Sequence, residues 1–184
     1  MIYILTGPVH YGKTGLLKKL YSEIKHSGIK FGGFLSEPVR EKNRVEGYDL
    51  FDLKAGQSLP FIRRKGEKSW EKSGPFFFIP ETLALAKKII LGSRDSEFCI
   101  VDEVGPLELE GRGLWPALEQ VLFQAFPPFL LVVRDSILDK FLKTKLQGED
   151  IKIFDIKDKD IYARMTNPEL FIKDVDMNNS GYIF

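Results

Sequence analysis

The hydrophobic and polar positions of the chain switch between the spacing of buried strands and the spacing of helices. Residues 2–5 form a short apolar run that is typical of a buried strand. From residue 13 to residue 26, apolar side chains recur at helical spacing, and Gly28 provides the stop. The chain is therefore predicted to open with a strand, a glycine-bounded loop and a helix.

Two extended runs follow, at residues 29–39 and 45–53, and a short polar stretch joins them. The second run alternates apolar and charged residues, which indicates an antiparallel pair with one face buried. Residues 61–72 are polar and locally basic, and we expect them to form an excursion on the surface. Residues 76–79 (FFFI) predict a short strand or a packed turn.

The second half of the chain alternates helical and apolar strand-like segments. Pro80 suits the first position of a helix, and the continuous apolar run at residues 98–101 is typical of a central parallel strand. The predicted helices are 80–91, 114–126 and 137–146, and the predicted strands are 98–101, 129–133 and 151–154. Strands separated by helices predict a three-layer α/β fold whose mostly parallel sheet carries an inserted antiparallel hairpin. We expect one domain at 1–157 and a tail at 158–184 that packs on the domain or extends from it.

The composition excludes several classes of protein. The chain has 184 residues, 27 Lys plus Arg against 26 Asp plus Glu, and a formal net charge of +1. This balance argues against binding to long nucleic acids or to anionic membranes, both of which favour excess positive charge. One cysteine and two histidines make a zinc site of the usual kind unlikely to form. No protein partner can be identified from these features.

The chain lacks the patterns that direct a protein into a membrane or out of the cell. No segment approaches the roughly 20 apolar residues that span a bilayer. Residues 1–6 lead directly into Gly7 and Pro8, without the charged start and apolar stretch of a secretory signal. We therefore expect a cytoplasmic protein.

A phosphate-binding pattern follows the first predicted strand. Residues 7–14 (GPVHYGKT) fit the Walker A pattern, in which backbone N–H groups and a helix N-terminus surround phosphate oxygens. Lys13 would reach the β- and γ-phosphates, and the Thr14 hydroxyl would bind Mg²⁺. A chance match is expected in on the order of one in a hundred chains of this size. The predicted phosphate-binding residues are Gly7, Pro8, Val9, His10, Tyr11, Gly12, Lys13 and Thr14.

The apolar run at 98–101 ends in two acidic residues, which is the form of a Walker B strand. Asp102 would lie at the carboxyl end of a central strand, where ligands of open α/β sheets bind, and it would hold Mg²⁺ directly or through water. Glu103 is placed to orient or deprotonate an attacking water. The alternative is a pair of surface acids that happen to follow a core strand.

Four segments, taken together and in order, resemble the THEP-type nucleoside-triphosphatase family. They are residues 7–14, 33–40 (GFLSEPVR), 47–50 (GYDL) and 101–109 (VDEVGPLEL). The resemblance implies a P-loop NTPase fold of the RecA-like division and magnesium-dependent hydrolysis of several nucleoside triphosphates to diphosphate and phosphate. It also implies that Glu103 is the catalytic base and that Asp102 supports the metal. The chain departs from the family pattern at Gly15 and at residues 106–107 (PL), where the family usually has Thr and Lys-Met.

Three arginines are further candidates for stabilising the triphosphate. Arg40 and Arg44 lie on the predicted hairpin, which the family places near the nucleotide. Arg134 follows the strand at 129–133 and would emerge at the nucleotide edge of the sheet, as a sensor or an arginine finger. The alternatives are solvated hairpin arginines and, for Arg134, an ion pair with Asp135 or Asp139. Glu108 and Glu110, after the Walker B acids, are interpreted as parts of a polar loop.

These features predict an enzyme that hydrolyses ATP, GTP or other nucleoside triphosphates with Mg²⁺. Lys13 and Glu103 would be its catalytic residues, and Thr14 and Asp102 its metal ligands. Two alternatives stay open at the level of sequence. One is a nucleoside or nucleotide kinase on the same loop, and the other is a slow nucleotide-dependent switch or adaptor.

Overall fold

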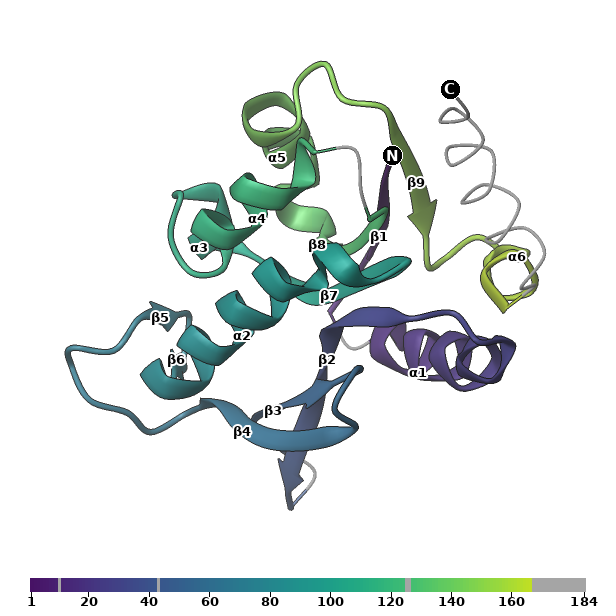
Figure 1. Cartoon of the computed structure of the whole chain (residues 1–184). Coiled ribbons are helices and arrows are strands. Elements are labelled where there is room, and N and C mark those ends of the chain that lie inside the picture. The colour runs from purple at the N-terminus through teal and green to yellow at the C-terminus, as the bar shows by residue number, and fades with distance from the viewer. Residues whose placement is uncertain (10, 43, 125–126, 167–184) are drawn as a thin grey trace.

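A sheet of nine strands runs through the part of the chain that the computed structural model describes, residues 1–9, 11–42, 44–124 and 127–166. The strands lie in the order β5-β6-β4-β3-β2-β7-β8-β1-β9 (Figure 1). Their bounds are β1 Ile2–Gly7, β2 Phe31–Glu41, β3 Arg44–Asp52, β4 Gln57–Arg63, β5 Lys72–Ser73, β6 Phe76–Phe78, β7 Phe98–Val104, β8 Phe129–Arg134 and β9 Ile151–Asp155. The helices are α1 Lys13–Ile24, α2 Pro80–Gly92, α3 Pro106–Leu109, α4 Trp115–Leu122, α5 Leu138–Lys145 and α6 Ile161–Thr166.

One half of the sheet is parallel, as the apolar runs predict. Strands β2, β7, β8, β1 and β9 pair in parallel, so their carboxyl ends meet at one edge. Strand β8 lies between β1 and β7, and its Arg134 pairs in register with Gly7. The loop after β1 and the acids at the end of β7 therefore flank Arg134 at the end of β8. The predicted loop, acids and arginine thus lie at one place on the sheet edge.

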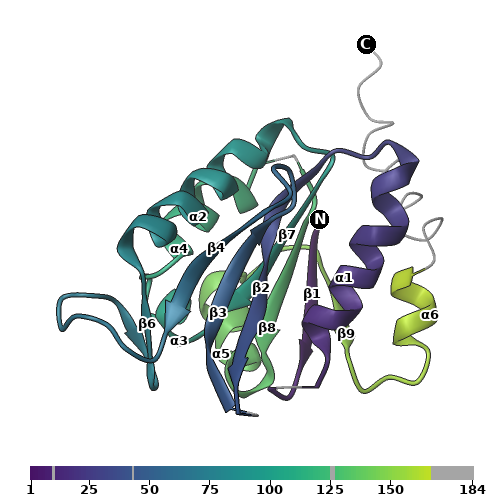
Figure 2. The same ribbon diagram turned by 90° about the horizontal axis from the view of Figure 1, so that it is seen from below.

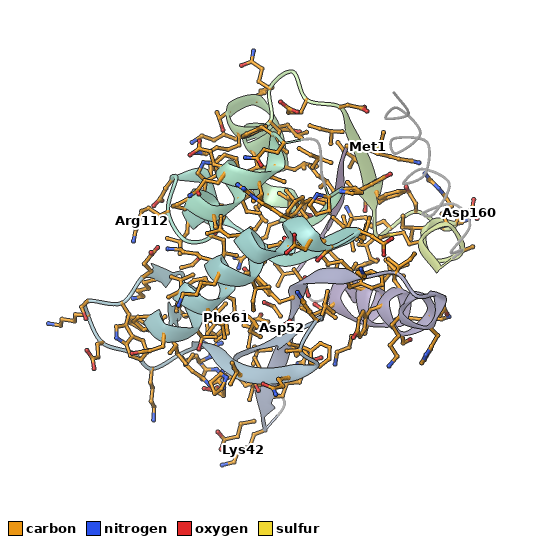
Figure 3. The ribbon with its side chains drawn as sticks, viewed as in Figure 1. Met1, Lys42, Asp52, Phe61, Arg112 and Asp160 are labelled. Atoms are coloured by element: carbon orange, nitrogen blue, oxygen red, sulfur yellow. The ribbon has the colours of Figure 1, made fainter. Side chains whose placement is uncertain are left out.

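The other half of the sheet is antiparallel and confirms the predicted hairpin. Strand β2 pairs with β3 from Phe34 opposite Asp52 to Glu41 opposite Arg44, and β3 pairs in turn with β4. At the hairpin tip, Lys42 has a φ of 46° and projects away from the sheet (Figure 3). The hairpin is thus an extension of the parallel sheet, since β2 belongs to both halves.

Strand β4 corrects the first part of the surface excursion predicted at residues 61–72, whereas residues 65–69 are exposed and lie outside helices and strands, as predicted. Phe61 and Ile62 are buried, and the Phe61 ring meets Phe34 and Phe78 edge to face at 5.7 and 5.4 Å (Figure 3). The prediction failed because β4 begins with exposed polar residues and contains Pro60, which disfavours a strand assignment. Burial of aromatic rings across the sheet outweighs these local signals.

Helices cover both faces of the sheet and give the predicted three layers. Helices α1 and α6 lie on one face, and α2, α3, α4 and α5 lie on the other (Figure 2). Strand β7 contributes to both cores, because Cys99 and Val101 face α2 and α4 while Phe98 and Ile100 face α1. Burial on both faces explains why this strand is a continuous apolar run.

Helix α6 lies beside α1, the helix that follows the predicted phosphate-binding loop (Figure 1). Ile161 and Met165 are buried there in the same core as Leu16, Leu17 and Leu20 of α1. Residues 167–184 of the predicted tail lie outside the described residues. Within the described ranges, no helix is both long enough and apolar enough to cross a membrane.

Candidate active site

The loop between β1 and α1 has the backbone that the Walker A pattern predicts. Gly7 has a φ of 136°, and a Cβ at this position would lie 2.3 Å from Cγ2 of Ile156. Gly12 has a φ of 88° and caps the start of α1. Gly7 needs glycine because of its positive φ and the close approach of Ile156, and Gly12 needs it because of its positive φ. Of the predicted loop residues, His10 lies outside the described residues.

Lys13, the first residue of α1, folds back over this loop. Its Nζ donates hydrogen bonds to the carbonyl oxygens of Gly7 and Pro8, at 2.8 and 2.7 Å. Burial lowers the pKa of Lys13, while the negative charges of Asp102, Asp135 and Glu103 act in the opposite direction. The ammonium group is therefore held at the loop, where it can meet phosphate oxygens.

Thr14 and Asp102 lie together, as the sequence predicts for metal ligands. The Thr14 hydroxyl donates to Oδ2 of Asp102 at 2.8 Å, and the backbone N–H of Ser36 donates to the same oxygen at 3.2 Å. Asp102 is only 4% exposed. Burial raises its pKa to about 7, and the hydrogen bond from Thr14 acts in the opposite direction.

The chemistry of this oxygen cluster fits Mg²⁺. The described residues contain no cluster of three or more His, Cys, Asp or Glu side chains suited to a metal ion. Mg²⁺ is usually held by one or two carboxylates together with waters and substrate phosphates, so Thr14 and Asp102 are an adequate protein contribution. Ser36, whose backbone N–H contacts Asp102, has a buried Oγ atom without a hydrogen-bond partner. A hydrated cation held by Thr14 and Asp102 would offer this oxygen a hydrogen-bond partner.

Glu103 has a different partner from Asp102. Its Oε1 accepts a hydrogen bond from Nη2 of Arg134 at 2.7 Å, across the ends of β7 and β8. The two strands lose their regular register between Val101 and Val104, which is the segment that carries both acids. The charge of Glu103 is the main cause of the raised pKa of Arg134. Arg134 therefore pairs with the predicted base, and neither Asp135 nor Asp139 is the partner in its ion pair.

A cavity of about 340 Å³ joins the loop, the oxygen cluster and the Glu103–Arg134 pair. Gly7 and Pro8 are not among the lining residues, but their carbonyl oxygens accept hydrogen bonds from Lys13, which lines the cavity. Arg44 is not among the residues that line the cavity; its side chain is 67% exposed and lies 3.4 Å from Glu46. The predicted site residues that do line the cavity are Val9, Tyr11, Gly12, Lys13, Thr14, Arg40, Asp102, Glu103 and Arg134.

Three further polar residues line the cavity beyond those predicted from the sequence, namely Lys18, Ser36 and Tyr48. Ser36 lies in the segment 33–40 and Tyr48 in the segment 47–50, so both fall in segments that carry the family resemblance. Burial raises the pKa of Tyr48, and the negative charge of Glu103 adds to this effect. Only the pairing of β2 with β3 and β7 shows that these side chains meet the Walker acids.

Glu108 corrects the interpretation of a polar loop after the Walker B acids. It is only 2% exposed, and its two carboxylate oxygens accept the backbone N–H groups of Gly105 and Leu114 at 2.8 and 2.9 Å. Burial raises its pKa to about 7. The spacing of Gly105, Pro106 and Glu108 matches the half of a capping box in which a Glu at N3 reaches back to the N-cap. Glu108 thus fixes the loop that follows Glu103, whereas Glu110 is exposed and pairs with Arg112.

Comparisons with known proteins agree with this geometry. The sequence model of a family described as NTPase matches residues 2–164. The nucleoside-triphosphatase THEP1 of Metallosphaera sedula is 32% identical over 135 residues, which cover 73% of this chain and 72% of that protein. A cancer-related nucleoside-triphosphatase homolog of Bos taurus is 32% identical over 128 residues, covering 64% of this chain and 67% of that protein.

Solved structures support the fold. The crystal structure of THEP1 from the hyperthermophile Aquifex aeolicus superposes with a TM-score of 0.70 at 20% identity, covering 90% of this chain and 95% of that one. The solution structure of a human cancer-related nucleoside triphosphatase gives a TM-score of 0.69 at 23% identity and covers 98% of both chains. The family match over residues 2–164 confirms the predicted resemblance to the THEP-type nucleoside-triphosphatases. The chain belongs to the NTPase family, together with the THEP1 nucleoside-triphosphatases.

Proposed function

We propose that the protein hydrolyses nucleoside triphosphates to diphosphate and phosphate in a magnesium-dependent reaction. One observation carries the proposal: the adjacent acids Asp102 and Glu103 have separate partners on one cavity. Asp102 accepts from the Thr14 hydroxyl, and Glu103 pairs with Arg134. This separation supports the assignment of one acid to the metal and the other to the attacking water.

Binding of the triphosphate would use the loop and Lys13. The loop presents backbone N–H groups and the N-terminus of α1, which favour negative charge. Lys13 would exchange its carbonyl contacts with Gly7 and Pro8 for oxygens of the β- and γ-phosphates. Thr14 and Asp102 would hold Mg²⁺, which when bound neutralises charge on the β- and γ-phosphates.

The chemical step would be an in-line displacement at the γ-phosphorus. Glu103 orients the water and accepts its proton while the water oxygen forms a bond to phosphorus. The bond from phosphorus to the bridging oxygen breaks, and the diphosphate leaves with the electron pair. Arg134 holds Glu103 on the cavity side and places positive charge near the transferring group.

The test is a phosphate-release assay over ATP, GTP, CTP and UTP, with Mg²⁺ and with EDTA. We expect release of phosphate from at least one nucleotide with Mg²⁺ and none with EDTA. A panel of nucleoside monophosphates added to the same assay separates the kinase alternative, because a kinase would convert monophosphate to diphosphate without free phosphate. Stoichiometric transfer of that kind would contradict hydrolysis, which the names of the relatives support.

A further inference from the structure

Among the described residues that line the cavity, Ser36 is the one with a buried side-chain oxygen that lacks a hydrogen-bond partner. It lies on β2, two residues beyond the last paired position of β2 with β7, Phe34 opposite Val101. Ser36 is only 3% exposed, and its Oγ atom has no hydrogen-bond partner. A buried hydroxyl without a partner is unfavourable, so such groups in native proteins usually serve a ligand, an ion or a bound water.

The surroundings of Ser36 identify the chemistry of the missing partner. Ser36 lines the cavity, and its backbone N–H donates to Oδ2 of Asp102 at 3.2 Å. The Thr14 hydroxyl donates to the same oxygen at 2.8 Å. Residues from β2, β7 and α1 therefore meet at Oδ2 of Asp102, where the Thr14 hydroxyl and the backbone N–H of Ser36 both donate and the Ser36 hydroxyl is left without a partner.

We propose that the Ser36 hydroxyl is a positioning group for the divalent cation, to which it binds through a water of the hydration shell. The inference rests on the proposed function, because it takes Thr14 and Asp102 as the metal ligands. Mg²⁺ gives up its waters reluctantly and usually keeps several of them in protein sites. A metal-bound water needs an acceptor, and the Oγ of Ser36 is a buried acceptor on a cavity-lining residue that no described protein group uses. Partners of this kind orient the ligands and tune metal affinity.

The test compares Ser36→Ala with wild type in three measurements on the full chain. The first is the Mg²⁺ concentration at half-saturation for binding of a β,γ-imido analogue of ATP, repeated with Mn²⁺. The second is the affinity for the analogue in EDTA, and the third is the melting temperature without nucleotide. We expect the half-saturating Mg²⁺ concentration to rise about tenfold. We expect the affinity for the analogue in EDTA to be unchanged. We expect the melting temperature to be unchanged or raised.

Two variants serve as controls. Ser36→Thr retains the hydroxyl and should restore the Mg²⁺ response. Thr6→Val removes another buried hydroxyl, because Oγ1 of Thr6 is also without a partner but Thr6 is not among the residues lining the cavity. This control should leave the Mg²⁺ response as in wild type. A Thr6→Val shift equal to that of Ser36→Ala would overturn the proposal, since the effect would not be local to the cation.

Other outcomes also contradict the proposal. Superposable Mg²⁺ titrations of Ser36→Ala and wild type would show that the hydroxyl does not serve the metal. An equal loss of affinity in EDTA would assign Ser36 to the phosphate instead, and a lowered melting temperature with no Mg²⁺ effect would assign it to the fold. Since the analogue is not hydrolysed, these readouts stand apart from phosphate release. Absence of hydrolysis in wild type with the Mg²⁺ effect intact would contradict the proposed function alone.

Discussion

The guanidinium group of Arg134 lies 2.7 Å from Oε1 of Glu103, and this contact joins the ends of two adjacent parallel strands. Asp102, one residue before Glu103, has no part in the pair and accepts from Thr14 instead. Two consecutive acids are thus committed to different sides of one cavity. The proposed mechanism depends on this division, because it assigns one carboxylate to the metal and the other to the attacking water.

Replacement of Arg134 tests the role of the pair. We expect Arg134→Ala to lower kcat by roughly 10²–10³, because it removes the positive charge near the transferring phosphoryl group and the contact that orients Glu103. KM should change much less, and Arg134→Lys should recover only part of the rate because it lacks the planar fork. Steady-state kinetics of the three proteins provide the measurement. A faster Arg134→Ala enzyme would show instead that Arg134 masks the base.

Replacement of Lys13 tests phosphate binding at the loop. We expect Lys13→Ala to weaken nucleotide affinity by about two orders of magnitude and to abolish turnover, since charge-assisted hydrogen bonds contribute roughly 1.5–3 kcal/mol each. Lys19→Ala, on the same helix but outside the cavity lining, is the matched control and should bind as wild type. Titration calorimetry with a non-hydrolysable analogue measures both. Equal affinities for Lys13→Ala and Lys19→Ala would contradict the assignment of Lys13.

The two hairpin arginines provide a matched comparison. Arg40 lines the cavity, whereas Arg44 is exposed beside Glu46 and outside the lining. We expect Arg40→Ala to raise KM several-fold and Arg44→Ala to leave kinetics and stability within error, as exposed ion pairs contribute little. Michaelis–Menten kinetics and thermal melts check both variants. An Arg44→Ala defect as large as that of Arg40→Ala would place the nucleotide further along the hairpin than the cavity does.

Glu108 predicts a pH dependence of stability. Burial raises its pKa from 4.5 to about 7, so between these values the folded protein holds a proton that the unfolded chain has released. Stability should therefore fall as pH rises through this window, by on the order of 3 kcal/mol, and Glu108→Gln should lack this component. Urea unfolding of both proteins at pH 5 and pH 8 measures it, and Asp102 contributes equally to both. Parallel pH profiles would contradict the raised pKa.

The elements that the sequence predicted well are those whose local pattern and tertiary environment agree. The apolar run of β7 is buried on both faces, and α1 spans Lys13–Ile24, with a 3₁₀ turn at Lys25–Ser27 before Gly28, which has a φ of 88°. Strand β4 escaped prediction because Pro60 and its polar first residues oppose the strand that the Phe61 contacts stabilise. Local propensity is a weak guide where cross-sheet packing decides the structure.

The site was predictable where the chemistry lies within one motif. The convergence of the loop at residues 7–14 with Asp102 and Glu103 at one cavity could be predicted, because the spacing of these segments is that of phosphate-binding and metal-binding motifs. Ser36 and Tyr48 could not, because only the order of β3, β2 and β7 in the sheet brings them to the acids. Glu108 was misassigned because a charged residue in a loop is usually exposed, whereas here two backbone N–H groups satisfy its carboxylate.

Glu103→Gln tests whether Glu103 activates the attacking water, because it removes the base and keeps the shape of the side chain. Glu110→Gln is the matched control, since Glu110 is a nearby exposed acid paired with Arg112. The measurement is magnesium-dependent phosphate release under single turnover, with affinity for a non-hydrolysable analogue determined on the same preparations. We expect Glu103→Gln to bind as wild type and to lose roughly 10²–10⁴ in rate, with Glu110→Gln unaffected. Hydrolysis by Glu103→Gln at the wild-type rate would show that Glu103 does not activate the attacking water.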